Sequence, residues 1–175
     1  LLVDVIVAKY APLPASSLGP LVSLLMGGVP QWRHHRQAML QRARLRLPSA
    51  LVNGMTWFWP EGERPASGHH AVEDRVRLLA PFDPVVWDRR RFELLWGWPY
   101  RFEAYTPAAQ RVRGHYAMPL LWRDQVIGWG NLSVSSGVLT PDVGFVNAAP
   151  KDKAFRVALD EELHRMAVFL KLNKA

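Results

Sequence analysis

The sequence predicts an α+β protein in two parts, a winged helix followed by a small β-barrel or rolled sheet with a C-terminal helix. Three observations predict it. Three helix-like segments precede two short strand-like runs joined by Asn53-Gly54, the strongest two-residue hairpin signal. Several strand-like runs then follow one another between residues 100 and 147, which is typical of a compact barrel or rolled sheet. A closing amphipathic helix is predicted from Asp152 to Leu172.

The composition is that of a globular chain with an anionic partner. The 175 residues are 49% hydrophobic, and no apolar run approaches the length that spans a bilayer. The formal net charge of +7 points to nucleic acid. With no cysteine, the chain has neither a disulfide framework nor Cys-ligated zinc. We expect no metal or other cofactor, no membrane partner, and a cytoplasmic, nucleoid-associated monomer.

The predicted elements of the first part occupy residues 1–60. Residues 1–10 fit a strand or a helix, and the segments that follow favour a helix. Ser16 or Ser17 is expected to cap a second helix that runs to Gly27-Gly28. A third helical segment and a hairpin of two strands complete the order of a winged helix: Trp32–Arg46, Leu47–Val52 and Met55–Trp59. Because the chain opens on LLVDVIVAKY, without a signal-peptide pattern, we expect it to start inside a domain, as a fragment of a longer protein.

Residues 61–77 are charged and rich in turn formers, so they are the predicted linker to a second domain at residues 78–175. Asp83 lies between two prolines and is expected to cap a turn. A short helix should follow, with Trp87, Leu94 and Leu95 on its buried face and Gly97 at its end.

Two strand-like runs, Tyr100–Thr106 and His115–Trp122, are predicted to form a β-hairpin with a basic tip. Gln125–Ser135 should add a strand, and Val138–Asn147 another that is broken at Pro141-Asp142. The closing helix is expected to bury the apolar residues that recur every three or four positions: Phe155, Leu159, Leu163, Met166 and Leu170.

Two basic segments are candidates for DNA contact. In the first, the third helical segment, no acidic residue accompanies Arg33, Arg36 and Arg42, and the third helix of a winged helix usually enters the major groove. The alternative is a basic helix face that is merely solvated. In the second, the hairpin tip, the candidates are Gln110, Arg111, Arg113 and His115, whose contacts with phosphate would make affinity salt-dependent. The alternative is a loop tip that only improves solubility.

The acidic residues and histidines do not predict a catalytic or metal site. Asp83, Asp88 and Glu103 are better explained as a turn cap, an ion pair at a helix start, and a strand residue facing solvent or an arginine. The pairs His34-His35 and His69-His70 place adjacent side chains in diverging directions, without a third ligand at a useful spacing.

The stretch from Leu78 to Gly130 resembles a known family. Its pattern LL-x-PFDP-VVWDR-x-R, then YR-x-E-x-YTPA, a basic loop and MPLLWRDQVIG, is similar to the C-terminal part of the winged-helix crosslink-repair DNA glycosylases of the YcaQ/AlkX type, related to AlkZ. The match is dense over this stretch and weak before it. After Gly137 it depends mainly on the terminal helix.

The resemblance implies a DNA-repair function. Members are monofunctional DNA glycosylases, built from tandem winged helices and a C-terminal barrel, which unhook interstrand crosslinks and excise alkylated bases. A hairpin of the barrel is implicated in engaging the DNA beside the lesion, and the predicted hairpin of this chain resembles it. The catalytic signature of the family is Gln-x-Asp or Gln-x-Gln in the first winged helix, where a carboxylate or amide positions water.

This chain contains no such signature. Its glutamines are followed two positions later by Arg33, Met39, Ala43, Val112 and Ile127. We therefore expect the catalytic module upstream of Leu1, a chain that is inactive alone, and damaged double-stranded DNA as its partner. The alternatives are a non-enzymatic winged-helix DNA-binding module or regulator, and a barrel that binds proteins.

Overall fold

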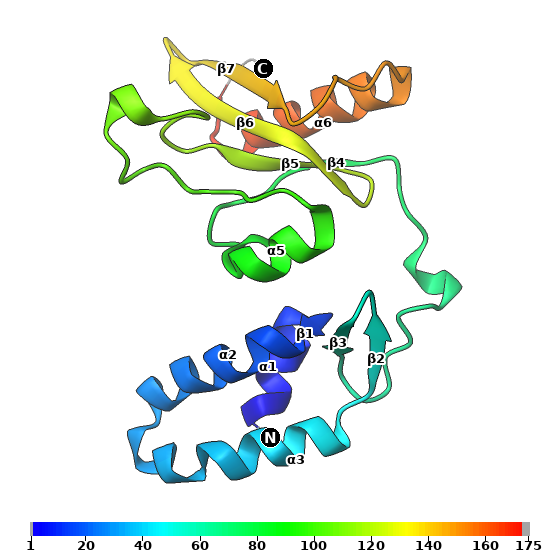
Figure 1. Ribbon diagram of the computed structural model, residues 1–175. Coiled ribbons are helices and arrows are strands. Elements are labelled where there is room, and N and C mark those ends of the chain that lie inside the picture. The colour runs from blue at the N-terminus through cyan, green and yellow to red at the C-terminus, as the bar shows by residue number, and fades with distance from the viewer. Residues whose placement is uncertain (1, 173–175) are drawn as a thin grey trace. The chain divides into compact units, whose positions relative to one another are not determined.

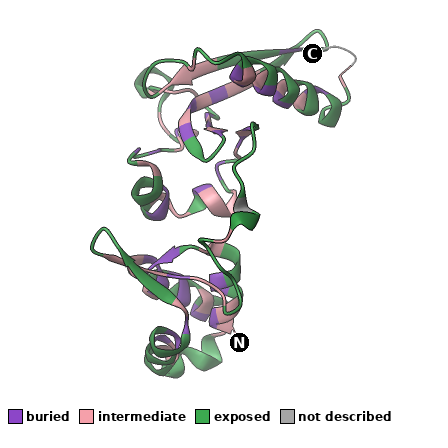
Figure 2. Ribbon diagram, turned by 90° about the vertical axis from the view of Figure 1, so that its right-hand side faces the viewer, coloured by how far each residue is buried: buried purple, intermediate pink, exposed green. Residues whose placement is uncertain are grey.

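The computed structural model describes residues 2–172, which form two compact units, residues 2–70 and 71–172 (Figure 1). Each unit has hydrophobic clusters of its own, and the buried residues, purple in Figure 2, lie on the inner sides of its helices and strands. The division between the units falls within residues 61–77.

The first unit combines three helices with a small antiparallel sheet in the order β1-β3-β2. In chain order its elements are α1 (Leu2–Tyr10), β1 (Leu13–Pro14), α2 (Ala15–Gly28), the 3₁₀ helix η1 (Pro30–His35), α3 (Arg36–Arg46), β2 (Ser49–Val52), β3 (Met55–Phe58) and the 3₁₀ helix η2 (Gly68–His70). The helix predicted for residues 1–10 and the Asn53-Gly54 hairpin are confirmed. Both turn residues have positive φ, 50° and 74°, as the tight two-residue turn requires.

The start of α2 differs from the prediction. Neither Ser16 nor Ser17 is the N-cap, because Pro14 occupies that position and both serines lie inside the helix. The reason is β1, which pairs Leu13 and Pro14 with β3 and so holds the chain extended up to the residue before the helix. The unit's core joins all three helices and the sheet through Val7, Leu13, Leu18, Leu40 and Phe58.

The second unit is a curled four-stranded antiparallel half-barrel, in the order β4-β5-β6-β7, with a C-terminal helix. Its elements are β4 (Val76–Leu78), α4 (Pro84–Trp87), α5 (Arg89–Trp96), the 3₁₀ helix η3 (Ala108–Gln110), β5 (Met118–Trp122), β6 (Gln125–Ser135), β7 (Val138–Phe145) and α6 (Lys153–Phe169). The expected break at Pro141-Asp142 is wrong. β7 continues through Pro141 because β7 is an edge strand. On an edge strand a proline, which has no N–H to donate, can face away from the neighbouring strand.

The hairpin predicted from Tyr100–Thr106 and His115–Trp122 is also wrong. Only residues 118–122 form a strand, which pairs with β4 and β6, while residues 99–117 form a loop that contains η3. Pro99 and Pro107 lie at the ends of the first expected strand and lack the N–H that a ladder needs.

The helix predicted before Gly97 is two short helices. Asp83 caps α4 and Asp88 caps α5, accepting hydrogen bonds from the Val85 N–H at 2.8 Å and the Arg91 N–H at 3.1 Å. The restart at Asp88 changes which side is buried. Val86, Arg91 and Phe92 are inside, whereas the residues expected there, Trp87, Leu94 and Leu95, are exposed. Gly97 ends α5 at φ 65°, as predicted.

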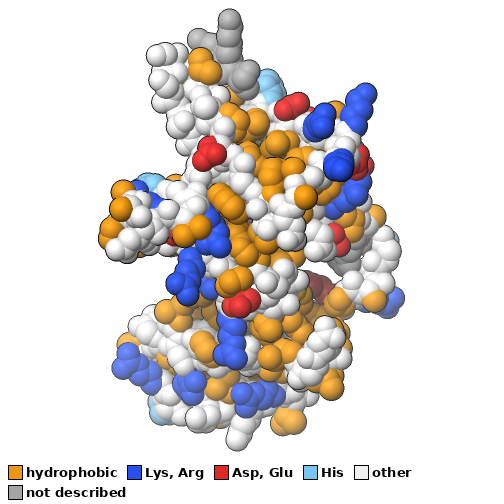
Figure 3. Space-filling model, turned by 45° about the horizontal axis from the view of Figure 1, so that its top comes forward, with side chains coloured by type: hydrophobic (Ala, Val, Ile, Leu, Met, Phe, Trp, Pro, Cys, Tyr) orange, Lys and Arg blue, Asp and Glu red, His pale blue; other side chains and the backbone are white. Residues whose placement is uncertain are grey.

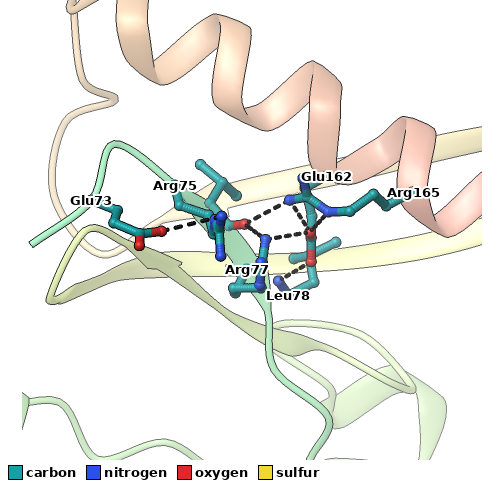
Figure 4. Close-up of polar contacts among 7 residues, drawn as sticks. Glu73, Arg75, Arg77, Leu78, Glu162 and Arg165 are labelled. Carbon is teal, nitrogen blue, oxygen red and sulfur yellow. Dashed lines mark hydrogen bonds and ion pairs between the residues drawn. The ribbon is translucent and has the colours of Figure 1, made fainter.

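The predicted closing helix is confirmed as α6, and a buried carboxylate that the sequence did not reveal attaches it to β4 (Figure 4). Glu162 accepts the Leu78 N–H at 2.9 Å and pairs with Arg165 at 2.6 Å and Arg77 at 3.3 Å. Arg165 also donates to the Val76 carbonyl at 3.2 Å. Phe155 packs into the sheet core as expected, but Leu170 lies beyond the helix and is exposed.

Candidate nucleic-acid interface

The loop at residues 99–117 is organised around Glu103, which is buried. One of its carboxylate oxygens, Oε2, accepts three backbone N–H groups, from Val112 at 2.9 Å, Arg113 at 2.8 Å and Gly114 at 3.3 Å. The carboxylate thus joins the two halves of the loop, a role that strand pairing was expected to play. Burial raises the pKa of Glu103, but the three N–H groups and the Arg113 guanidinium outweigh burial and hold this pKa below its ordinary value.

Arg113 directs its charge into the unit. Its Nη1 lies 3.7 Å from Glu103, and its guanidinium lies over the rings of Trp98 and Trp129, 5.1 Å and 5.7 Å from their centroids. Only 18% of the side chain is exposed, and its Nε is buried without a hydrogen-bond partner among residues 2–172. These contacts pack the charge between two aromatic faces and a carboxylate, which is a favourable desolvated environment for arginine.

Gly114 and Tyr100 complete the loop's frame. Gly114 has φ 121°, and a Cβ there would lie 2.5 Å from Asn131, whose amide donates to the Arg113 carbonyl at 2.7 Å. The Tyr100 hydroxyl donates to the Ala117 carbonyl at 2.6 Å, and burial raises the pKa of Tyr100 to about 12. The loop is therefore held at both ends and in the middle.

The other predicted contact residues of this loop reach the surface. Gln110 and His115 are exposed. Arg111 is half-buried, with its Nε donating to the Thr106 carbonyl at 2.8 Å, and within residues 2–172 no carboxylate pairs with it. The bond at Nε orients the side chain and leaves the charge of Arg111 uncompensated.

The basic segment of the first unit also contains both exposed arginines and an arginine that contacts the protein itself. Arg33 in η1 and Arg42 in α3 are exposed and, in the described part of the chain, form no ion pair. Arg36 is half-buried, and its guanidinium donates to the Ser23 hydroxyl at 2.8 Å and the Gly19 carbonyl at 3.4 Å. Arg36 therefore joins the start of α3 to α2, while Arg33 and Arg42 remain available to a partner.

Arg42 also borders a groove between α1 and α3 that has a volume of about 820 Å³. Trp32 and Met39 contribute apolar surface to it, and Arg46, at its edge, pairs with Asp4. On the face of the molecule drawn in Figure 3, Lys and Arg side chains are interspersed with hydrophobic ones. The groove and the face drawn in Figure 3 both combine positive charge with apolar area.

The carboxylates considered for catalysis are used within the fold. Asp83 and Asp88 are helix caps, and Glu103 is occupied by backbone N–H groups and Arg113. Residues 2–172 contain no cluster of three or more His, Cys, Asp or Glu side chains that could hold a metal ion. In that same range no helix is long and apolar enough to cross a membrane.

Comparison with known proteins gives the family. No solved structure matches this chain. The family model for DNA glycosylase AlkZ-like proteins matches residues 1–169, which is nearly the whole chain and extends well beyond the stretch that carried the resemblance. Because this match covers far more than half of the sequence, the chain belongs to the AlkZ-like DNA glycosylase family, and membership of that family implies DNA as the substrate.

Proposed function

We propose that this chain binds and orients damaged double-stranded DNA for a glycosylase that unhooks interstrand crosslinks and excises alkylated bases. The observation that carries the proposal is the set of arginines that the fold leaves uncompensated, in a chain of net charge +7 that belongs to a DNA glycosylase family. Such arginines neutralise phosphates and supply most of the affinity of non-specific DNA binding.

The first unit is proposed to be a winged helix. Its element order α1-β1-α2-α3-β2-β3 and its sheet order β1-β3-β2 support this, with β2 and β3 as the wing. In that arrangement α3 is the helix that enters the major groove, and the proposed phosphate or base contacts are Arg42 of α3 and Arg33 of the preceding η1.

In the second unit the proposed contacts are Gln110, Arg111 and His115. Arg113, and likewise Arg36 of the first unit, is proposed to support the surface through internal contacts, because the guanidinium groups of both residues interact with protein groups. A contact between Arg113 and phosphate would require it to leave the buried Glu103, which is an unfavourable exchange.

The hairpin that the family resemblance implies is proposed to be β6–β7. Of the two hairpins in the half-barrel, β5–β6 has its turn residue Arg123 paired with Asp74 and Asp152. The β6–β7 tip, at Ser136-Gly137, is exposed and uncharged. Its proposed contribution is a shape contact with the DNA groove rather than neutralisation of phosphates.

Cleavage of the N-glycosyl bond is proposed to depend on residues outside these 175. The chain contains neither Gln-x-Asp nor Gln-x-Gln, and its three candidate carboxylates are used in caps and in the Glu103 network. The purified chain should therefore release no base from alkylated duplex DNA, and base release by this polypeptide would refute this part of the proposal.

DNA binding is tested by titrating the chain against a duplex at several salt concentrations. The logarithm of the binding constant should fall linearly with the logarithm of salt, and the double variant Arg33→Ala, Arg42→Ala should reduce the slope by roughly 2. Arg156→Ala, an exposed arginine on α6, is the matched control and should leave the slope unchanged. The absence of binding even at low salt would refute the proposal.

A further inference from the structure

Four aromatic side chains of the second unit form a cluster that reaches the surface, and its central member, Phe102, packs against the hydrophobic core. Phe102 lies at the centre, and its ring centroid is 5.4 Å from Phe82, 6.1 Å from Tyr105 and 5.3 Å from Tyr116, all edge to face. The outer three rings are exposed, Phe82 by 59%, Tyr105 by 90% and Tyr116 by 44%. Exposed large apolar groups that gather in one place mark interaction surfaces.

The charge around this aromatic cluster indicates what kind of partner it fits. Arg101 adjoins Phe102 in the sequence and is exposed, and Arg111 and His115 belong to the same loop. The only acidic residue between positions 99 and 117 is Glu103, which is buried and paired with Arg113. Asp83, next to Phe82 in the sequence, is half-buried and caps α4. The loop therefore presents aromatic faces in positive surroundings, which complement an anionic partner that has flat apolar faces of its own.

Nucleic acid with unpaired bases has this chemistry. Its backbone is anionic, and each base that has lost its neighbours offers a face on which an aromatic side chain can stack. The bases of an intact duplex are stacked on one another and offer no such face. We propose that the aromatic cluster stacks on unpaired bases where the strands of bound DNA are separated. This inference rests on the proposed function and adds a preference for the form of DNA that is bound.

The test compares two DNAs of equal length and equal phosphate number, a fully paired duplex and the same duplex with a short central mismatch bubble. Equal phosphate numbers keep the electrostatic contributions similar, and comparison with Tyr105→Ala isolates the contribution of the aromatic ring. A 2-aminopurine in the bubble reports stacking directly through quenching of its fluorescence. The 175-residue chain is compared with Tyr105→Ala, with Tyr105→Phe, and with Val112→Ala as a matched control in the same loop.

The wild-type chain should bind the bubble roughly tenfold more tightly than the duplex, the effect of one stacked base. Tyr105→Ala should lose this preference and the quenching, with its binding to the paired duplex unchanged. Tyr105→Phe keeps the ring and Val112→Ala keeps the cluster, so both should behave as wild type. Because Tyr105 is 90% exposed, its replacement should leave the fold intact, which circular dichroism verifies.

Two outcomes would overturn the inference while duplex binding stands: equal affinities for the two DNAs, or a preference for the bubble that survives in Tyr105→Ala. Either would favour a protein as the partner of the aromatic cluster. If the chain binds neither DNA, the proposed function is refuted, and the inference with it.

Discussion

The basic segment at residues 30–46 and the loop at residues 99–117 are both rich in arginine, but they are built differently. In the first, charge is carried on a regular helix that exposes Arg42, and one arginine, Arg36, binds the neighbouring helix. In the second, no regular element exists, and a buried carboxylate with an arginine packed against it gives the loop its shape.

The difference shows that arginines two or a few positions apart can have very different environments. Arg111 and Arg113 belong to the same loop, yet Arg111 lacks a carboxylate partner among residues 2–172 while Arg113 is packed against Glu103, Trp98 and Trp129. The segment of the first unit is largely helical and uses Arg36 to contact α2, whereas the loop of the second unit is held by Glu103 and Arg113. Variants that remove the internal charges should therefore affect stability, and variants that remove the outward charges should affect DNA binding.

The largest expected effect is that of Glu103→Ala. It leaves three backbone N–H groups and the Arg113 charge without their partner, so the free energy of unfolding of the second unit should fall by about 4 kcal/mol. Urea denaturation followed by circular dichroism measures the change. Glu93→Ala, an exposed residue on α5, is the control, and an equally small effect of both would mean that Glu103 does not organise the loop.

Arg113→Ala should have the next largest effect, a loss of about 2–3 kcal/mol, because Glu103 keeps its three N–H donors when the guanidinium is removed. Arg111→Ala should change the free energy of unfolding by less than about 0.5 kcal/mol, because Arg111 is only half-buried and its removal breaks a single hydrogen bond. The same denaturation series compares them. Equal losses for the two arginines would contradict the distinction drawn between them.

Gly114→Ala should destabilise the unit by about 2 kcal/mol, because alanine is strained at φ 121° and its Cβ would collide with Asn131. Gly137→Ala is the matched control. Gly137 also has positive φ, 77°, but a Cβ there meets no atom within 4 Å, so only the backbone strain of about 1 kcal/mol remains. A smaller loss at Gly114 than at Gly137 would show that the loop can move away from Asn131.

The smallest effect is on the pH dependence of stability. Because the pKa of Glu103 is lower in the folded protein than its ordinary value of 4.5, its contribution is fully present above that pH and is lost as pH falls toward the folded pKa. The wild type should therefore lose stability in this acidic range more steeply than Glu103→Gln. Parallel curves for the two proteins would show that Glu103 does not titrate with a lowered pKa.

The parts of the fold that depend on local chemistry were predictable from the sequence. Asn53-Gly54 requires positive φ and gave the hairpin, Gly97 ends α5, and the pattern after Asp152 gave α6. The two-residue strand β1 was missed because it is too short to leave a pattern, and this also displaced the expected cap of α2.

The errors in the loop have a non-local cause. The alternation of apolar and polar residues from Tyr100 to Thr106 resembles a strand, but Glu103 is buried by partners nine to eleven residues later in the chain. The role of Arg113 depends on Trp129, which is farther still. Sequence chemistry identified which segments are basic, and the choice of which arginine is buried required the tertiary contacts.

If the outward arginines of residues 30–46 and 99–117 bind DNA while the inward arginines of the same segments shape the surface, the two sets should differ in their effect on DNA binding. The salt dependence of duplex binding is determined for Arg42→Ala, Arg111→Ala, Arg36→Ala and Arg113→Ala, each at a temperature where it is folded. Each of the first two variants should reduce the slope by about 0.9, and the last two should leave the slope at its wild-type value. A reduced slope for Arg113→Ala with unchanged slopes for Arg42→Ala and Arg111→Ala would contradict this prediction.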